Sequence, residues 1–204
     1  MIRFCQDIGL WALDRPVSSC LHRTRFCAAH CYNRKLYRLY PAMKTRDQKN
    51  ETYWQGLTGQ ALGQDLKRKR KGPNGRLRLC TRGEPFSTEQ DVLKVLEILR
   101  ANRRVLLWIP TRAWRNKALR NMIEQHVLPE KNARVLASID PSNTQQEIEG
   151  LRASGWSTMF FGDNTERTGS YRCPKTWQGR KGACSTCQAG CFSASRVDVH
   201  LKTH

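Results

Sequence analysis

The sequence predicts an α/β fold, a six-stranded parallel partial barrel. Short apolar runs of strand length alternate with longer segments whose apolar residues recur at helical spacing. The short runs end at proline, glycine or polar residues, as buried strands do. Strand–helix–strand units of this length form right-handed crossovers, which make the strands parallel and bury both faces of the sheet.

The predicted elements follow in a regular order. Strands are expected at residues 8–13, 76–80, 105–109, 134–139, 158–161 and 196–201. Helices are expected at residues 32–40, 47–57, 118–126 and 144–153, and another starts at the capping-box pattern of residues 87–90. We expect a barrel with an N-terminal cysteine loop over residues 1–165, and a cysteine-rich segment with the last strand over residues 166–204.

The charge of the chain indicates a polyanionic partner. The formal net charge is +19, so nucleic acid is the natural partner, although a merely soluble basic protein has the same composition. A basic run at residues 67–71 leads into a predicted turn at residues 72–75. This run suits a phosphate-contacting loop and equally a solvated connector, and a nuclear address less well.

Nine cysteines in a chain of this kind favour metal binding over disulfides. The N-terminus lacks the apolar run of a signal peptide, and no stretch reaches the roughly 18 apolar residues of a membrane span. We therefore expect a cytoplasmic protein with reduced thiols and no membrane contact. The sequence indicates neither its oligomeric state nor its host.

The densest group of thiols lies between residues 20 and 32. Cys20, Cys27 and Cys31 occur within this polar stretch, with His22 and His30 between them. A structural core rarely needs so much sulfur in so polar a run. The pattern favours a site that holds iron, with the histidines more simply explained as loop polarity.

Polar residues also follow each later strand of the predicted barrel. Because the carboxyl ends of parallel strands meet at one edge, these residues are expected around one mouth. Glu84, Arg112 and Asp140 are the candidate catalytic residues of this group. The simpler explanation for the two carboxylates is helix capping or loop hydrogen bonding, and Arg112 is one of 36 basic side chains.

This ordered set resembles the radical S-adenosylmethionine superfamily. The resemblance implies a six-stranded partial barrel in which Cys20, Cys27 and Cys31 bind a [4Fe–4S] cluster and leave one iron free for S-adenosylmethionine. The superfamily loop is usually C-x3-C-x2-C, whereas the spacing here is C-x6-C-x3-C.

The same resemblance implies cofactor-binding residues. Residues 82–85, Arg-Gly-Glu-Pro, are similar to the superfamily's Gly-Gly-Glu-Pro motif, which implies that Gly83 and Glu84 lie beside the cofactor. Ser138 corresponds to the polar end of the fourth strand.

Over nearly its whole length the chain is similar to a family of phage and plasmid proteins called gene product 88. The first cysteine lacks the proline that follows it in the family. The matching segments are Cys20, residues 27–32, 83–84, 111–114, 138–140, 173–174 and 184–192.

A second sulfur group lies near the C-terminus. Its four thiols suit a tetrahedral zinc site or a second iron–sulfur cluster, or some of them join the first three. An overlapping C2H2 zinc-finger spacing would use His200 and His204, but residues 197–202 alternate as a strand does. The four thiols are Cys173, Cys184, Cys187 and Cys191.

The leading hypothesis is therefore an iron–sulfur protein similar to radical S-adenosylmethionine enzymes that acts on nucleic acid. The runner-up is a non-enzymatic, zinc-stabilised DNA- or RNA-binding protein of a mobile element. A host-takeover protein with an acidic target is a third option. The sequence alone does not choose among them.

Overall fold

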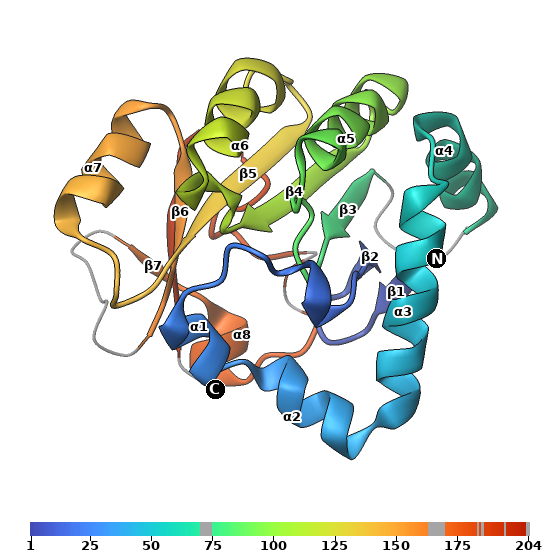
Figure 1. Cartoon of the computed structure of the whole chain (residues 1–204), viewed down its shortest axis with the longest axis horizontal. Coiled ribbons are helices and arrows are strands. Elements are labelled where there is room, and N and C mark those ends of the chain that lie inside the picture. Colours follow the sequence, from blue (N-terminus) through green and yellow to red (C-terminus); the bar gives the residue numbers. More distant parts are fainter. Residues whose placement is uncertain (70–74, 163–169, 183, 185, 194, 203–204) are drawn as a thin grey trace.

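The structure is a computed structural model that describes residues 1–69, 75–162, 170–182, 184, 186–193 and 195–202. These residues form one mixed α/β fold around a single sheet (Figure 1). Its strands are β1 (Arg3–Cys5), β2 (Leu10–Leu13), β3 (Arg76–Leu79), β4 (Leu106–Thr111), β5 (Ala133–Ile139), β6 (Ser157–Phe161), β7 (Tyr171–Arg172) and β8 (Asp198–Leu201).

The strand order is β1-β2-β3-β4-β5-β6-β8-β7. Strand β1 runs antiparallel to β2, and all the other neighbouring pairs are parallel. The six predicted strands occur as β2, β3, β4, β5, β6 and β8, which follow one another across the sheet in chain order. The predicted number was too low, because the short edge strands β1 and β7 bring the described sheet to eight.

Helical segments join the strands. They are η1 (Val17–Ser19), α1 (Arg25–Ala29), α2 (Tyr32–Leu39), α3 (Pro41–Gln55), α4 (Gly59–Arg68), α5 (Glu89–Ala101), η2 (Ala113–Arg115), α6 (Lys117–Met122), the π-helical turn η3 (Ile123–Val127), α7 (Gln145–Ala153) and α8 (Pro174–Gln178).

Local sequence explains where these helices begin. Thr88 and Asp91 form a capping box at α5, and Thr144 and Glu147 form another at α7. Pro41 was predicted to separate two helices and instead occupies the first turn of α3, where its missing amide has no intrahelical partner to lose. Helix α4 was not predicted.

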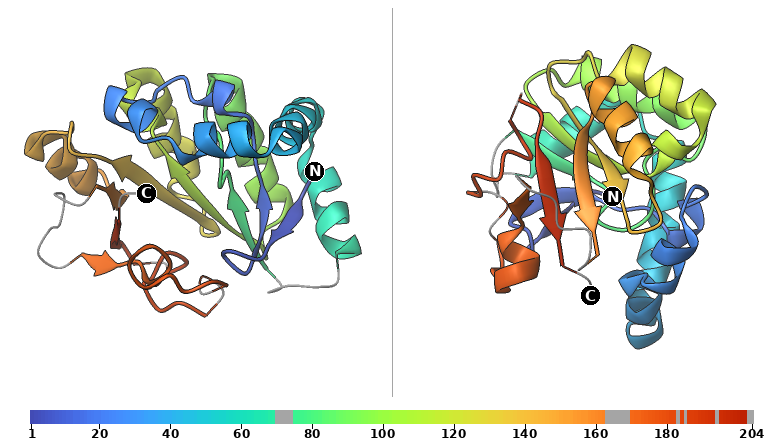
Figure 2. Two further views of the ribbon diagram at one scale, coloured as in Figure 1. Left: turned by 90° about the horizontal axis from the view of Figure 1, so that it is seen from below. Right: turned by 90° about the vertical axis from the view of Figure 1, so that its left-hand side faces the viewer.

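The sheet has two differently covered faces. In Figure 2, helices α2 to α6 lie on one side of the sheet and the segment from β7 to β8 lies on the other. Alternation along the strands explains this: Leu77 and Leu79 of β3 belong to the helix-side core, whereas Trp108 of β4 and Leu136 of β5 belong to a second core on the other face.

Some predictions fall outside the described residues. They are the greater part of the turn at residues 72–75, the end of the basic run at residues 70–71, residues 163–164 and His204. Within the described part of the chain, none of the helices has the length and hydropathy needed to cross a bilayer.

Candidate metal centre

The first cysteine group lies where the chain leaves β2. Cys20 follows η1, Cys27 lies in α1, and Cys31 is the N-cap residue of α2. All three are free thiols of intermediate burial. The side chain of Thr24 accepts a hydrogen bond from the Cys27 amide at 2.9 Å and so caps α1.

The three thiols share one electrostatic environment. Burial raises the pKa of Cys20 to about 12, and the charges of Glu84, Cys27 and Cys31 add to the rise. Burial also raises the pKa of Cys27, against the opposing charge and hydrogen bond of Arg112. The structure therefore brings the three predicted ligands together beside an arginine and a carboxylate.

Glu84 joins the loops that follow β3 and β4. Its Oε1 accepts a hydrogen bond from Thr111 Oγ1 at 2.6 Å, and its Oε2 accepts one from the Arg112 amide at 2.9 Å. Burial raises the pKa of Glu84 to about 7, while these bonds act in the opposite direction. Both oxygens of this carboxylate are thus bound by the protein's own chain.

Asp140, at the end of β5, holds the cysteine loop and Arg112 at the same time. Its Oδ2 accepts hydrogen bonds from Thr24 Oγ1 at 2.5 Å and from Arg112 Nη1 at 2.8 Å. Burial opposes ionisation of Asp140, but hydrogen bonds from Ser142 and Thr24 and the Arg112 charge outweigh it, so its pKa lies below the ordinary value. Sequence reasoning missed Thr24, whose only signal is its helix-capping position before α1.

Gly83 occupies a position that only glycine fits. Its φ is +78°, and a Cβ atom there would lie 2.5 Å from the Arg15 carbonyl oxygen and 2.8 Å from Ser19 Oγ. The next amide, that of Glu84, donates to Ser19 Oγ at 2.8 Å. The close approach of these two loops fixes the start of the cysteine loop against the end of β3. Ser138 contributes its carbonyl oxygen, which accepts from Trp114 Nε1 at 3.1 Å.

A buried ion-pair network supports this edge of the sheet, and sequence reasoning missed it. Arg82 Nη2 lies 2.7 Å from Asp14 Oδ2, and its Nε lies 2.6 Å from Asp47 Oδ2. Arg15 Nη1 lies 2.9 Å from Asp91 Oδ2 and connects β2 to α5. No sequence pattern distinguishes these arginines from the many exposed ones.

The histidines of the cysteine loop are engaged elsewhere. His22 Nε2 lies 3.3 Å from the Ser87 carbonyl oxygen. His30 stacks on Phe26, with 4.2 Å between the ring centroids.

The second cysteine group lies over the other face of the sheet. Cys173 is the N-cap residue of α8, and all four cysteines of this group are free thiols. Burial raises the pKa of Cys191 to about 12, and the charges of Cys173, Cys184 and Cys187 add to the rise. The four C-terminal thiols therefore also lie close to one another.

The arrangement of the donors bears on what they would hold. Among the described residues, no three Cys, His, Asp or Glu side chains are placed to coordinate a single metal ion. Four thiolates on one zinc ion, at about 2.3 Å each, would stand about 3.8 Å apart. A four-iron cluster takes each thiolate on a different iron and spaces its ligands more widely, so wider groups of buried thiols suit a cluster.

The predicted zinc-finger ligand His200 lies in a strand. It is buried in β8, as the alternating pattern indicated, and its Nε2 lies 2.9 Å from the Gly162 carbonyl oxygen. The second finger histidine, His204, is outside the described residues.

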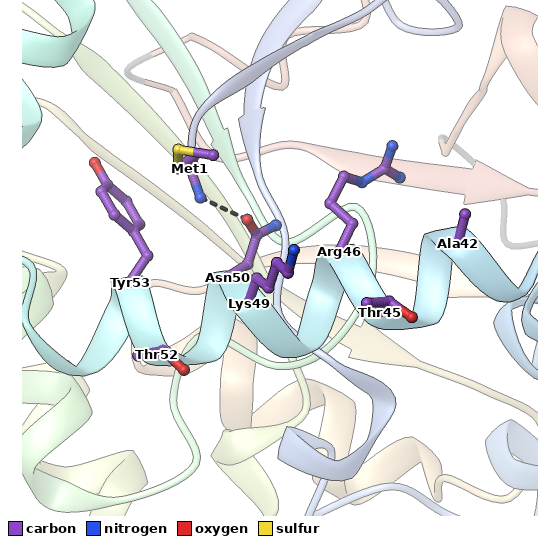
Figure 3. Close-up of a pocket in the computed structure, with 8 residues that line it drawn as sticks. All are labelled: Met1, Ala42, Thr45, Arg46, Lys49, Asn50, Thr52 and Tyr53. Atoms are coloured by element: carbon purple, nitrogen blue, oxygen red, sulfur yellow. Dashed lines mark hydrogen bonds between the residues drawn. The ribbon is translucent and has the colours of Figure 1, made fainter.

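A shallow hollow on the surface is separate from both cysteine groups. It follows α3, and the Met1 amino group donates to Asn50 Oδ1 within it (Figure 3). The residues described as lining it are Met1, Ala42, Thr45, Arg46, Lys49, Asn50, Thr52 and Tyr53.

Comparison with known proteins identifies the family. No curated protein and no solved structure matches the chain. The family model described as gene product 88 matches residues 8–190, a range that contains the first cysteine group and three of the four cysteines of the second. The chain therefore belongs to the gene product 88 family.

Proposed function

We propose that this protein is an iron–sulfur protein in which Cys20, Cys27 and Cys31 hold a [4Fe–4S] cluster, and that it is an S-adenosylmethionine-dependent radical enzyme acting on nucleic acid. The observation that carries the proposal is the gathering of three free thiols, rather than four, beside a buried arginine at the carboxyl ends of parallel strands. Three protein ligands leave one iron of such a cluster open.

The surrounding residues fit this group. Arg112 donates a hydrogen bond toward Cys27 and pairs with Asp140, so one fixed cation faces the negative charge that a thiolate-bound cluster carries. The six parallel strands in chain order, with helices on one face, support a partial-barrel arrangement. With a cluster bound and an external one-electron donor, the chemistry supplied is reductive cleavage of S-adenosylmethionine to methionine and a 5′-deoxyadenosyl radical, which takes a hydrogen atom from the substrate.

Within this proposal the polar residues position the cysteine loop. Glu84 ties the ends of β3 and β4 together, since both of its oxygens accept hydrogen bonds from the chain. Asp140 orients Arg112 and holds Thr24. Gly83 lets the loop approach closely, because a side chain there would meet the Arg15 carbonyl group.

Nucleic acid is the proposed substrate class because of the surface next to the cysteines. All the basic residues between positions 23 and 49 are exposed, and the only acidic residue in that stretch, Asp47, is buried. Tyr40, which is 58% exposed, lies on the same stretch and offers a ring for base stacking. The basic residues are Arg23, Arg25, Arg34, Lys35, Arg38, Lys44, Arg46 and Lys49.

Anaerobic reconstitution tests the proposal. The full chain is loaded with iron and sulfide, reduced with dithionite and incubated with S-adenosylmethionine, and 5′-deoxyadenosine and methionine are measured. We expect both products from the wild type and neither from Cys27→Ser. A reduced, cluster-loaded protein that leaves the cofactor intact would refute the enzymatic part of the proposal.

A second candidate function is a non-enzymatic, metal-stabilised nucleic-acid-binding protein, which the exposed basic stretch favours because its charge needs no cluster. This candidate predicts salt-dependent binding to nucleic acid that is unchanged after iron is removed. It also predicts a colourless protein with zinc at the C-terminal cysteines. A brown protein that contains inorganic sulfide would count against it.

A further inference from the structure

The C-terminal cysteines lie against a small core on the face of the sheet opposite the main helices. Cys184 and Cys191 pack against the cluster of buried side chains that contains Trp108 of β4 and Leu136 of β5. The ring of Phe192, the residue after Cys191, meets the Trp108 ring edge-on with 5.7 Å between the centroids. The four thiols are therefore held over the middle of the sheet and away from the cysteine loop.

Two hydrogen-bond donors in this core lack acceptors. Trp108 is only 6% exposed, and its Nε1 has no hydrogen-bond partner within the described residues. The Nε of Arg78, on the neighbouring strand β3, is likewise buried without one, and its guanidinium carbon lies 4.3 Å from the centre of the Trp108 ring. A buried N–H group without an acceptor costs about 1–3 kcal/mol, so a bound group that accepts from these donors would relieve that cost.

The Arg78 charge reaches the cysteines. It lowers the pKa of both Cys184 and Cys191, against the larger rise that burial causes. A buried cation beside four thiols suits a bound group with excess negative charge, because four thiolates on a metal centre leave the centre anionic.

The spacing of the donors favours a cluster over a single ion. The described residues contain no set of three ligands placed on one metal ion, although the four thiols are close enough to act on one another's ionisation. Inorganic sulfides also offer acceptors to nearby N–H groups, which zinc itself does not.

We propose that Cys173, Cys184, Cys187 and Cys191 hold a second iron–sulfur cluster, and that Arg78 and Trp108 are positioning residues whose N–H groups hydrogen-bond to its sulfurs and raise its reduction potential. This inference goes beyond the proposed function, and it stands whether or not the first cysteine group binds a cluster.

The test isolates the second site in the full-length chain. A variant with Cys20, Cys27 and Cys31 all changed to serine removes the first group, and the protein is reconstituted anaerobically with iron and sulfide. We expect this variant to retain iron, sulfide and one cluster signal in its Mössbauer spectrum. Adding Cys184→Ser and Cys187→Ser should abolish the signal.

The role of Arg78 is measured in that background by a redox titration followed by electron paramagnetic resonance. Arg78→Gln removes the charge, which disfavours the reduced cluster, so we expect its reduction equilibrium to weaken at least tenfold, or about 59 mV for one electron. Arg78→Lys keeps the charge and should shift the potential less. Arg100→Gln is the matched control, because Arg100 lies on α5 on the other face and is paired with Glu130.

Trp108→Phe provides an independent variant if Arg78→Gln does not fold. It keeps an aromatic ring in the core and removes only the N–H donor, so the potential should fall by a smaller amount. The proposal is overturned if the triple-serine protein binds zinc without sulfide. The assigned role of the two donors is overturned if Arg78→Gln or Trp108→Phe leaves the potential at the value of the Arg100→Gln control.

Discussion

Replacing Thr24 with valine should detach the cysteine loop from the end of β5. The hydroxyl group of Thr24 has two partners: it accepts from the Cys27 amide at 2.9 Å and donates to Asp140 Oδ2 at 2.5 Å. Thr24 is 6% exposed, so water does not readily replace either partner. Valine has the same shape without the hydroxyl group and therefore removes both bonds while the packing is preserved.

The expected loss of stability follows from these two bonds. Removing a helix N-cap costs about 0.5–2 kcal/mol. Removing a hydrogen bond to a buried charged group costs about 1.5–3 kcal/mol. Asp140 keeps Arg112 and Ser142 as partners, so it is not left without donors. The free energy of unfolding should fall by about 2–5 kcal/mol, a large share of the stability of a typical domain.

Urea denaturation of the metal-free, reduced protein measures this change. Thr24→Ser keeps the hydroxyl group and serves as the matched control, with an expected loss below about 1 kcal/mol. Hydrogen exchange at the Cys27 amide should accelerate in Thr24→Val and remain slow in Thr24→Ser. A loss in Thr24→Val that does not exceed that of Thr24→Ser would show that the hydroxyl group does not anchor the loop, and the assembly described for this site would be wrong.

Three further substitutions test the surroundings of the site. Gly83→Ala should lower the free energy of unfolding by more than about 2 kcal/mol, because of its φ of +78° and the 2.5 Å approach to the Arg15 oxygen, whereas Gly150→Ala in α7 has open space and should be neutral. Asp14→Asn should cost about 3–5 kcal/mol at pH 7, because it leaves the buried Arg82 short of charge. Burial raises the pKa of Asp14, but Arg82, Thr81 and Arg3 outweigh it; the net pKa lies below 3.8, so the wild type loses this contribution as pH falls below about 4, and Asp14→Asn should lose less. Changing three exposed basic residues of α2 to glutamine should reduce the salt slope of nucleic-acid binding by about 2–3, at roughly 0.7–0.9 for each contacted phosphate; the residues are Arg34, Lys35 and Arg38.

Each of these expectations has a plain contradicting result. Equal melting temperatures for Gly83→Ala and Gly150→Ala would remove the steric argument at the end of β3. An acid-unfolding profile of Asp14→Asn identical to that of the wild type would show that the buried network does not depend on this charge. Nucleic-acid binding with an unchanged salt slope would place the contact surface away from α2.

The sequence was most informative where local pattern decides structure. The continuous apolar run before Pro110 predicted β4, and the alternation of Val197, Val199 and Leu201 with polar residues predicted β8 over a recognition helix. Edge strands β1 and β7 were not predicted, because residues 3–5 and 171–172 form strands only by pairing with a neighbour already in place.

The candidate site was predictable in outline but not in its connections. The positions of Glu84, Arg112 and Asp140 after their strands indicated a shared edge, because parallel strands bring their ends together. The sequence does not show that Glu84 spends both oxygens on internal hydrogen bonds, nor that Arg78 is buried beside the second thiol group. Such facts depend on which side chains the tertiary fold excludes from water.

The most direct measurement for the central claim is the iron and acid-labile sulfide content of full-length protein purified without oxygen, compared with a variant that carries serine at positions 20, 27 and 31. Our account predicts that these three substitutions remove about four iron and four sulfide per chain, as expected for one cubane cluster. Identical iron and sulfide contents in the two proteins would contradict it.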